Sequence, residues 1–282
     1  MLTGDDLEDD YIPDDDIFSD QEEEFQPTFK EDQHTPEGDS VLLKKRKRRE
    51  KEKEKRIKKR KLADSLQSED TKSPSTFQLS SPEFAATYLS LQQKSVYNKL
   101  SFLELEDLKI PESCILNSTS YSDPRTLDNL GNFIEKCTPR LMIRLKQQSK
   151  FNGAPTLIFI AGAALRVADI TRILRKFKGE KGGDVAKLFA KHLKLQDHIT
   201  YLRRTKVGVA VGTPGRLGQL LEAEALTLPA LTHIFLDVSF QDAKKRTIFD
   251  IPEIREEIFR GVLCRENILS ALKSGQIQLV LF

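Results

Sequence analysis

The sequence predicts an α/β domain built on a parallel β-sheet, and two observations lead to that prediction. First, segments 156–162 (TLIFIAG) and 206–212 (KVGVAVG) are continuous apolar runs rich in β-branched residues. Strands of parallel sheets are covered on both faces, so they read as unbroken apolar runs rather than alternating ones. Second, segments with apolar residues at helical spacing alternate with these runs, which is the order typical of βαβ units.

The other elements follow along the chain. Ser81 and Pro82 suit the cap and first turn of a helix, and helical spacing continues over 84–100. Residues 114–118 (CILNS) predict a short strand, and 126–148 predict a helix disturbed at Pro139. Further helices are expected over 164–177, 184–204 (one or two), 214–226, 251–263 and 266–275, and further strands over 232–238 and 276–282.

Charge divides the first 80 residues into two blocks. Residues 1–24 hold twelve Asp and Glu and no Lys or Arg, whereas residues 44–61 hold fourteen Lys and Arg against three Glu. Charge blocks of this kind repel internally and bury little, so we expect a disordered, acidic then basic tail over 1–80. A helical extension over 81–111 and the α/β domain over 112–282 follow. Ser19 precedes acidic residues and is a candidate phosphorylation site.

The basic block predicts nuclear targeting and sequence-independent contact with nucleic acid. The residues expected to carry the targeting are Lys44, Lys45, Arg46, Lys47, Arg48, Arg49, Lys58, Lys59, Arg60 and Lys61. The three cysteines form no CxxC motif, which argues against a disulfide framework and a zinc site. The acidic N-terminus is unlike a signal peptide, and no run of eighteen apolar residues predicts a membrane span. We expect no cofactor, no metal and no membrane partner.

The segment VAVGTPGRLGQLL resembles the strand, TPGR turn and helix of the first RecA-like lobe of DEAD-box RNA helicases. IFIAGAALRVADI, THIFLDVSF and QIQLVLF resemble further segments of that lobe, in the correct order. The resemblance implies a P-loop NTPase-like fold. It also implies contact between RNA phosphates and Thr213, Pro214, Gly215, Arg216, Gly162 and Arg166, because hydroxyls, helix N-termini and guanidinium groups suit phosphate. The alternative is that TPGR is only a good way to begin a helix.

The positions where ATP would be bound and split depart from the helicase pattern. A P-loop needs glycines, a Lys and a Ser or Thr; here Asp123 and Pro124 precede Arg125 and Thr126 without a glycine. Asp237 stands where the DEAD motif begins, but Val238 replaces the second acid. We therefore interpret Asp123, Arg125, Thr126 and Asp237 as a degenerate nucleotide site without catalysis.

The whole sequence resembles a particular non-helicase family still more closely. Three segments are similar to parts of the Cms-one family, which are DEAD-box-like proteins associated with the small-subunit (90S) pre-ribosome. These segments are FAATYLSLQQKSVYNKLSFLELEDLKIPES, LFAKHLKL and FLDVSFQDAKKRTIFDIPEIRE. The resemblance implies a non-catalytic factor of ribosome biogenesis in the nucleus and nucleolus. Its partners would be pre-ribosomal RNA and ribosome-assembly proteins. Two alternatives stay open: a divergent RNA-dependent ATPase that needs a partner, and a pure protein scaffold. The oligomeric state is open too.

Overall fold

The computed structural model describes residues 78–191 and 193–282. The chain divides into two units between Asp70 and Thr71, and the described residues belong to the second unit. The acidic residues 1–24, Ser19 and the basic block of residues 44–61 lie outside the described residues, so the expectations placed on them stay predictions. The domain boundaries expected from the sequence also stay predictions.

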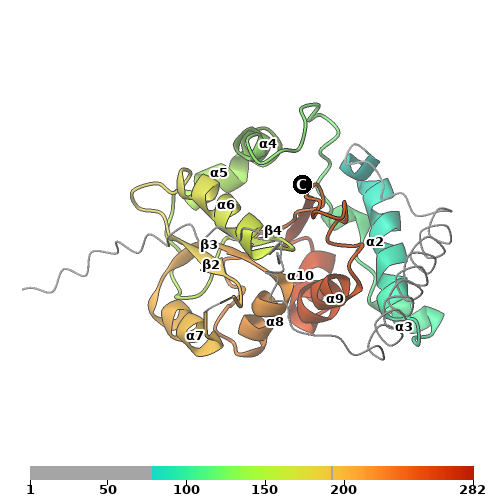
Figure 1. The fold of residues 1–282 in the computed structure, drawn as a ribbon. Helices are drawn as coiled ribbons and strands as arrows, with labels where there is room; N and C mark the ends of the chain where they lie inside the picture. Colours follow the sequence, from blue (N-terminus) through green and yellow to red (C-terminus); the bar gives the residue numbers. More distant parts are fainter. Residues whose placement is uncertain (1–77, 192) are drawn as a thin grey trace, which may run out of the picture. The chain divides into compact units, whose positions relative to one another are not determined.

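A five-stranded, wholly parallel sheet forms the centre of the described unit (Figure 1). Its strands lie in the order β2-β3-β1-β4-β5. Their bounds are β1 Leu157–Ile160, β2 Asp184–Leu188, β3 Val207–Gly212, β4 His233–Leu236 and β5 Gln278–Leu281. Every residue of β1 and β3 is buried, as the unbroken apolar runs predict. The parallel α/β class expected from the sequence is confirmed.

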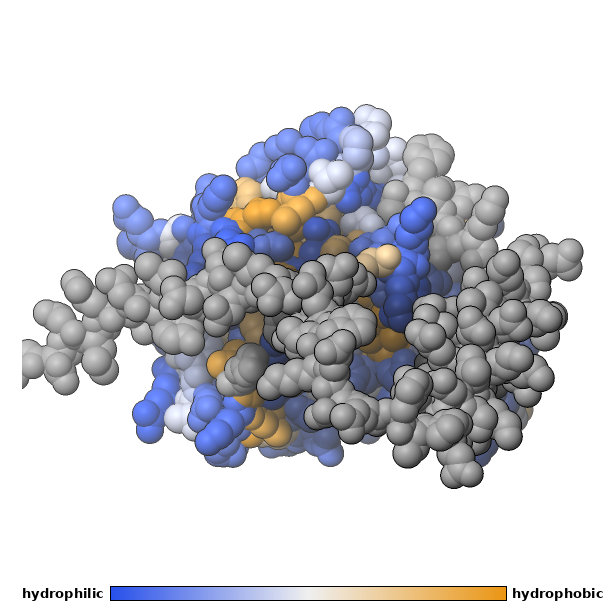
Figure 2. Space-filling model, in the orientation of Figure 1, coloured by the Kyte–Doolittle hydropathy of each residue, from blue (hydrophilic) through white to orange (hydrophobic). Residues whose placement is uncertain are grey.

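Helices cover both faces of this sheet. Alternate residues of β1 face opposite ways: Ile158 joins one apolar core and Phe159 joins the other. The first core includes side chains of α2, α7, α8, α9, η3 and α10, and the second includes those of α4, α5 and α6. In Figure 2 the outer surface of α4 is mostly hydrophilic, as expected for an amphipathic helix on the outside of a sheet.

The helix bounds agree largely with the sequence pattern. They are α2 Pro82–Val96, α3 Phe102–Asp107, α4 Leu130–Cys137, α5 Pro139–Leu145, α6 Ala164–Arg175, α7 Leu195–Arg204, α8 Pro214–Glu222, α9 Pro252–Glu256, the π-helix η3 Glu257–Leu263 and α10 Glu266–Lys273. Two 3-10 turns are η1 Gln78–Ser80 and η2 Glu112–Cys114. Pro139 divides the helix expected over 126–148 into α4 and α5, because proline cannot donate the hydrogen bond that would continue α4.

Two expectations are wrong. Residues 184–188, expected in a helix, form the edge strand β2, which pairs with β3. The short strand expected over 114–118 is reduced to the turn η2 and a single bridge between Ile115 and Leu279. In both places a neighbouring strand supplies backbone partners that periodicity along one segment does not reveal.

Candidate functional site: the carboxyl edge of the sheet

The carboxyl ends of the strands bring most of the predicted site residues to one edge, as parallel topology requires. Gly162 follows β1, Thr213 follows β3 and Asp237 follows β4. Backbone hydrogen bonds continue past the strand ends: the Ala161 amide donates to the Gly212 carbonyl over 3.1 Å, and the Asp237 amide donates to the Ile160 carbonyl over 3.0 Å. The edge is therefore a single, ordered surface.

The carboxylate of Asp237 is bonded to an arginine at the same edge of the sheet. Arg166, in the first turn of α6, donates from Nε to Oδ2 over 2.7 Å and from Nη2 to Oδ1 over 3.1 Å. Asp237 is completely buried, and the Arg166 guanidinium also lies 5.1 Å from the ring centroid of Phe240. Burial raises the pKa of Asp237, and the hydrogen bonds and charge of Arg166 oppose that shift. Both carboxylate oxygens of Asp237 thus accept hydrogen bonds from the guanidinium of Arg166.

The segment after β4 covers Gly162. A side chain at Gly162 would meet Ile248 Cγ2 at 2.9 Å. This covering segment is held by Asp242, which accepts from the backbone of Lys244 over 2.8 Å and from Arg246 Nη2 over 2.7 Å. Asp242 and Arg246 therefore form an ion pair near the surface of this segment.

The residues at the P-loop position serve the fold. Arg125 is buried and donates to the Leu281 carbonyl over 2.5 Å and to the hydroxyls of Ser80 and Ser118 over 2.6 and 2.8 Å. Burial lowers its pKa. Asp123 points away to an exposed ion pair with Lys136, 2.9 Å long. Arg125 therefore ties η1, the turn before α4 and the end of β5 together.

The TPGR turn begins α8 as predicted, but its arginine points inward. Arg216 is buried; Nη2 donates to the Leu193 carbonyl over 2.8 Å, and Nη1 lies 3.0 Å from His198 Nδ1. Because a guanidinium has no acceptor, Nδ1 of His198 accepts that hydrogen bond and the ring is neutral. Burial, followed by the charge of Arg216, lowers the pKa of His198 accordingly. Within the described residues, the partners of Arg216 are thus a histidine and a backbone carbonyl.

Glu257 occupies the start of α8. Its carboxylate accepts a hydrogen bond from the Gly215 amide, and a side chain at Gly215 would meet Glu257 Oε1 at 2.7 Å. A carboxylate here satisfies a free amide of the first helical turn and complements the helix dipole. Pro214 has no amide hydrogen to offer. Thr213 is half-buried, and its side chain makes no capping bond to the helix.

Three lysines flank this turn. Lys187 is on β2, and Lys191 and Lys194 belong to the loop between β2 and α7; all three are exposed, and none is ion-paired among the residues that the structure describes. The bond from Arg216 to the Leu193 carbonyl fixes this loop. The helix expected over 184–204 would place these lysines on a helix, whereas Lys187 lies on the strand β2. His198 and Glu257 carry no sequence signal of their roles.

Nowhere in 78–191 and 193–282 do three His, Cys, Asp or Glu side chains gather as a metal site would require. Among the helices of the same part, none has the length and apolar character that crossing a membrane demands.

The fold and this edge define a parallel α/β domain whose carboxyl edge is stabilised by internal ion pairs and hydrogen bonds. Sequence comparison is more specific. Residues 28–282 match the family described as CMS1, the U3-containing 90S pre-ribosomal complex subunit, and the chain belongs to this family.

Curated relatives are consistent with this assignment. The chain is 42% identical to Protein CMS1 of Chaetomium thermophilum over 61% of its own length and 67% of that protein. It is 33% identical to Protein CMSS1 of Homo sapiens over 64% of its length and 61% of that protein. Matched structures include S. cerevisiae Dbp5 bound to Nup159 and Gle1, with 16% identity over 69% of this chain and 45% of that one, TM-score 0.37. The yeast DEAD-box splicing factor Prp28 gives 16% identity over 65% and 34%, TM-score 0.29. Because both TM-scores lie below 0.5, we draw no conclusion from these two structures.

Proposed function

We propose that this chain is a non-catalytic RNA- and protein-binding subunit of small-subunit pre-ribosomes, acting in the nucleolus. The family description supports the pre-ribosomal role. The basic block of residues 44–61 supports nuclear import and general RNA affinity. Pre-ribosomal RNA and ribosome-assembly proteins would be its partners.

One observation carries the non-catalytic part of the proposal, the pair between Arg166 and Asp237. An ATP-splitting RecA-like domain uses the carboxylate at this position to hold magnesium through water. Here the carboxylate is completely buried and receives two hydrogen bonds from a guanidinium. Releasing it for a cation would leave Arg166 buried without its partner, which is costly. At the P-loop position, Arg125 likewise offers no donors to a phosphate, because its guanidinium is bonded to the protein itself.

ATP turnover tests this part directly. We expect the full chain to show no RNA-stimulated ATP hydrolysis above a protein-free blank. Asp237→Asn keeps the shape of the side chain while removing its charge, and it should give the same result. Turnover that is present in the wild type and lost in Asp237→Asn would establish the alternative, a divergent ATPase.

RNA contact at the TPGR turn is best supplied by groups that remain accessible. These are the Thr213 hydroxyl and the ammonium groups of Lys187, Lys191 and Lys194. Arg216 then acts as a positioning residue, because it holds the lysine-bearing loop through the Leu193 carbonyl. Phe189 lies beneath Lys187, whose Nζ is 5.7 Å from the ring centroid. The combination of a hydroxyl and three cations suits a phosphate backbone and carries no base specificity.

The test compares two triple substitutions of equal charge in the full chain. Lys187, Lys191 and Lys194 are changed to Gln in one variant; the exposed Lys146, Lys150 and Lys176 are changed to Gln in the other. We expect only the first to weaken single-stranded RNA binding and to reduce the slope of log K against log salt, by about 2 for three phosphate contacts. Photocrosslinked peptides should map to 187–194 as well as 44–61. Equal effects of the two triples would contradict a site at this turn.

A further inference from the structure

The corner formed by α2 and α3 exposes apolar side chains that the domain itself does not use. Seven large apolar side chains are exposed in the described residues, and four of them lie here: Phe84, Leu91, Phe102 and Leu103. Phe102 and Leu103 are 77% and 75% exposed. Such a concentration is unusual for a surface without a partner.

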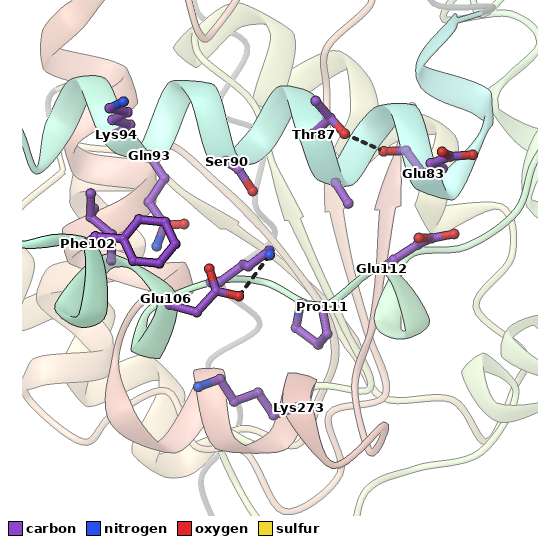
Figure 3. Close-up of a pocket in the computed structure, with 13 residues that line it drawn as sticks. Glu83, Thr87, Ser90, Gln93, Lys94, Phe102, Glu106, Pro111, Glu112 and Lys273 are labelled. Atoms are coloured by element: carbon purple, nitrogen blue, oxygen red, sulfur yellow. Dashed lines mark hydrogen bonds and ion pairs between the residues drawn. The ribbon is translucent and has the colours of Figure 1, made fainter.

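A groove of about 820 Å³ runs between these two helices (Figure 3). Ala86, Thr87 and Ser90 of α2 form one wall, and Phe102 and Leu105 of α3 belong to the opposite side. Phe84 and Leu91 are seven residues apart on α2 and hence on one helical stripe, which flanks the groove. The groove thus lies between an apolar ridge on α2 and another on α3.

Packing against the domain contributes little to α3. None of its six residues is buried. Its start is fixed instead by a capping box, in which the Glu104 amide donates to Ser101 Oγ and the Ser101 amide donates to the Glu104 carboxylate over 2.7 Å. A helix that is ordered by its own cap and turns its apolar residues to solvent is suited to contact with another surface.

Charges are separated along the groove. Glu83 and Glu112 lie at one end, and Lys94 lies at the other end beside Phe102 (Figure 3). Lys109 pairs with Glu106 over 2.8 Å between them. Across the described residues, Glu83, Glu112 and Lys94 have no ion-pair partner. Eleven residues of helix separate Glu83 from Lys94, a rise of about 16 Å.

We propose that this groove binds the same corner of a second copy of the chain, with the two α2 helices antiparallel. A two-fold axis then places Glu83 of each copy opposite Lys94 of the other, since antiparallel helices exchange their ends. It also sets the dipoles of the two helices in opposition, which is favourable. The ridge of Phe84 and Leu91 enters the facing groove, and Phe102 and Leu103 are covered.

The charge pattern favours a second copy over an unrelated helix because it is self-complementary. A carboxylate end and an ammonium end on one surface satisfy each other only when that surface meets itself in reverse. The apolar ridge and the groove beside it are likewise present once on each copy, so one contact fills both. An isologous interface needs no other component.

Sedimentation velocity of the full chain over a concentration series tests the proposal. The wild type should pass from monomer to dimer as concentration rises. Phe102→Asp should remain monomeric, because a carboxylate would be buried in the apolar contact. Ile143→Asp is the matched control: Ile143 is 63% exposed on α5, so the same chemical change there should leave the dimer intact.

Charge reversal identifies the antiparallel arrangement. Glu83→Lys alone brings two pairs of ammonium groups together, and Lys94→Glu alone brings two pairs of carboxylates together. Each should raise the dissociation constant about tenfold or more. An equimolar mixture of the two variants should recover the wild-type constant as a heterodimer, because both cross-pairs then join opposite charges. Thermal unfolding of each variant checks that α2 stays folded.

Three results would overturn the proposal. They are a wild type that stays monomeric at every concentration, a dimer that survives Phe102→Asp, and single charge variants whose mixture is no tighter than either variant by itself. The first result would assign the groove to a different protein. The second would assign the dimer to a different surface.

Discussion

The carboxyl edge of the sheet and the α2–α3 corner use their side chains in opposite ways. At the edge, Arg125, Arg166 and Arg216 are buried and bonded to acceptors of the same chain. At the corner, Phe102 and Leu103 face solvent. Groups expected to meet a ligand therefore hold the fold together, whereas groups expected in a core are exposed. Residue type alone therefore does not locate a binding surface. Whether an arginine faces a ligand or the protein interior depends on the hydrogen-bond acceptors within its reach.

Electrostatics explains why the arginines turned inward. A buried guanidinium is tolerated only when its donors are satisfied. Arg125 finds a carbonyl and two hydroxyls, and Arg166 finds a carboxylate. The hydrogen bonding of Arg216 is less complete, because its Nε has no partner in the described structure. Of the three arginines, Arg216 is thus the one whose loss should be tolerated best.

The largest effect is expected from breaking the pair at the edge. Asp237→Ala leaves Arg166 buried without a counter-charge, which should lower the free energy of unfolding by about 3–5 kcal/mol. Urea unfolding followed by circular dichroism measures this loss.

Asp123→Ala is the matched control, because Asp123 also pairs with a cation, Lys136, but at the exposed surface. Its loss should be below about 1 kcal/mol. Similar losses for both variants would mean that the edge is solvated and that the contrast with the corner does not hold.

The sequence predicts the sheet well where strands are central. The segments around β1 and β3 are continuous apolar runs, so burial on both faces identifies them. The edge strand β2 escapes prediction because Lys187 faces solvent and the run DVAKLFAKHLKL also fits helical spacing. At 114–118 the reverse happens: an apolar segment resembles a strand but makes one bridge. Segments at the edge of a sheet are the hardest to predict from the local sequence pattern, since they have a neighbouring strand on one side only.

The sequence predicts where the candidate site residues lie in the fold, but it does not predict how their side chains are bonded. Parallel topology places Gly162, Thr213 and Asp237 at one edge, and the structure brings them there. The bond between Arg166 and Asp237 joins residues 71 positions apart, so no local spacing reveals it. The inward turn of Arg216 depends on the Leu193 carbonyl, whose position follows from the unpredicted strand β2.

A smaller effect is expected at the opposite end of β4. Burial, followed by the charge of Arg144, lowers the pKa of His233 to about 4. The folded protein therefore binds this proton less well than the unfolded chain, whose histidine pKa is about 6.5. The stabilising contribution is complete above that value and is lost as pH falls toward 4. Between pH 7 and roughly pH 4.5 the loss should be about 2 kcal/mol.

Comparison with His233→Gln isolates this contribution from that of the carboxylates. The wild type should lose about 2 kcal/mol more than the variant over this pH interval when urea unfolding is repeated across it. Parallel pH profiles for the two proteins would show that His233 is solvated. The start of β4 around His233 would then be more exposed to solvent than the structure indicates.

The smallest effect is expected at the corner. Leu103→Gln replaces an apolar side chain that is 75% exposed, on a helix none of whose residues is buried. Its effect on the free energy of monomer unfolding should lie within about 0.5 kcal/mol, as for other surface changes. Dimerisation should nevertheless weaken, because the same side chain is covered in the second copy. Unfolding measured at dilution and sedimentation measured at high concentration separate the two quantities. A substitution at a contact surface weakens association without altering monomer stability, whereas a substitution in the core lowers monomer stability. A loss of monomer stability above about 1 kcal/mol would therefore place Leu103 in the core.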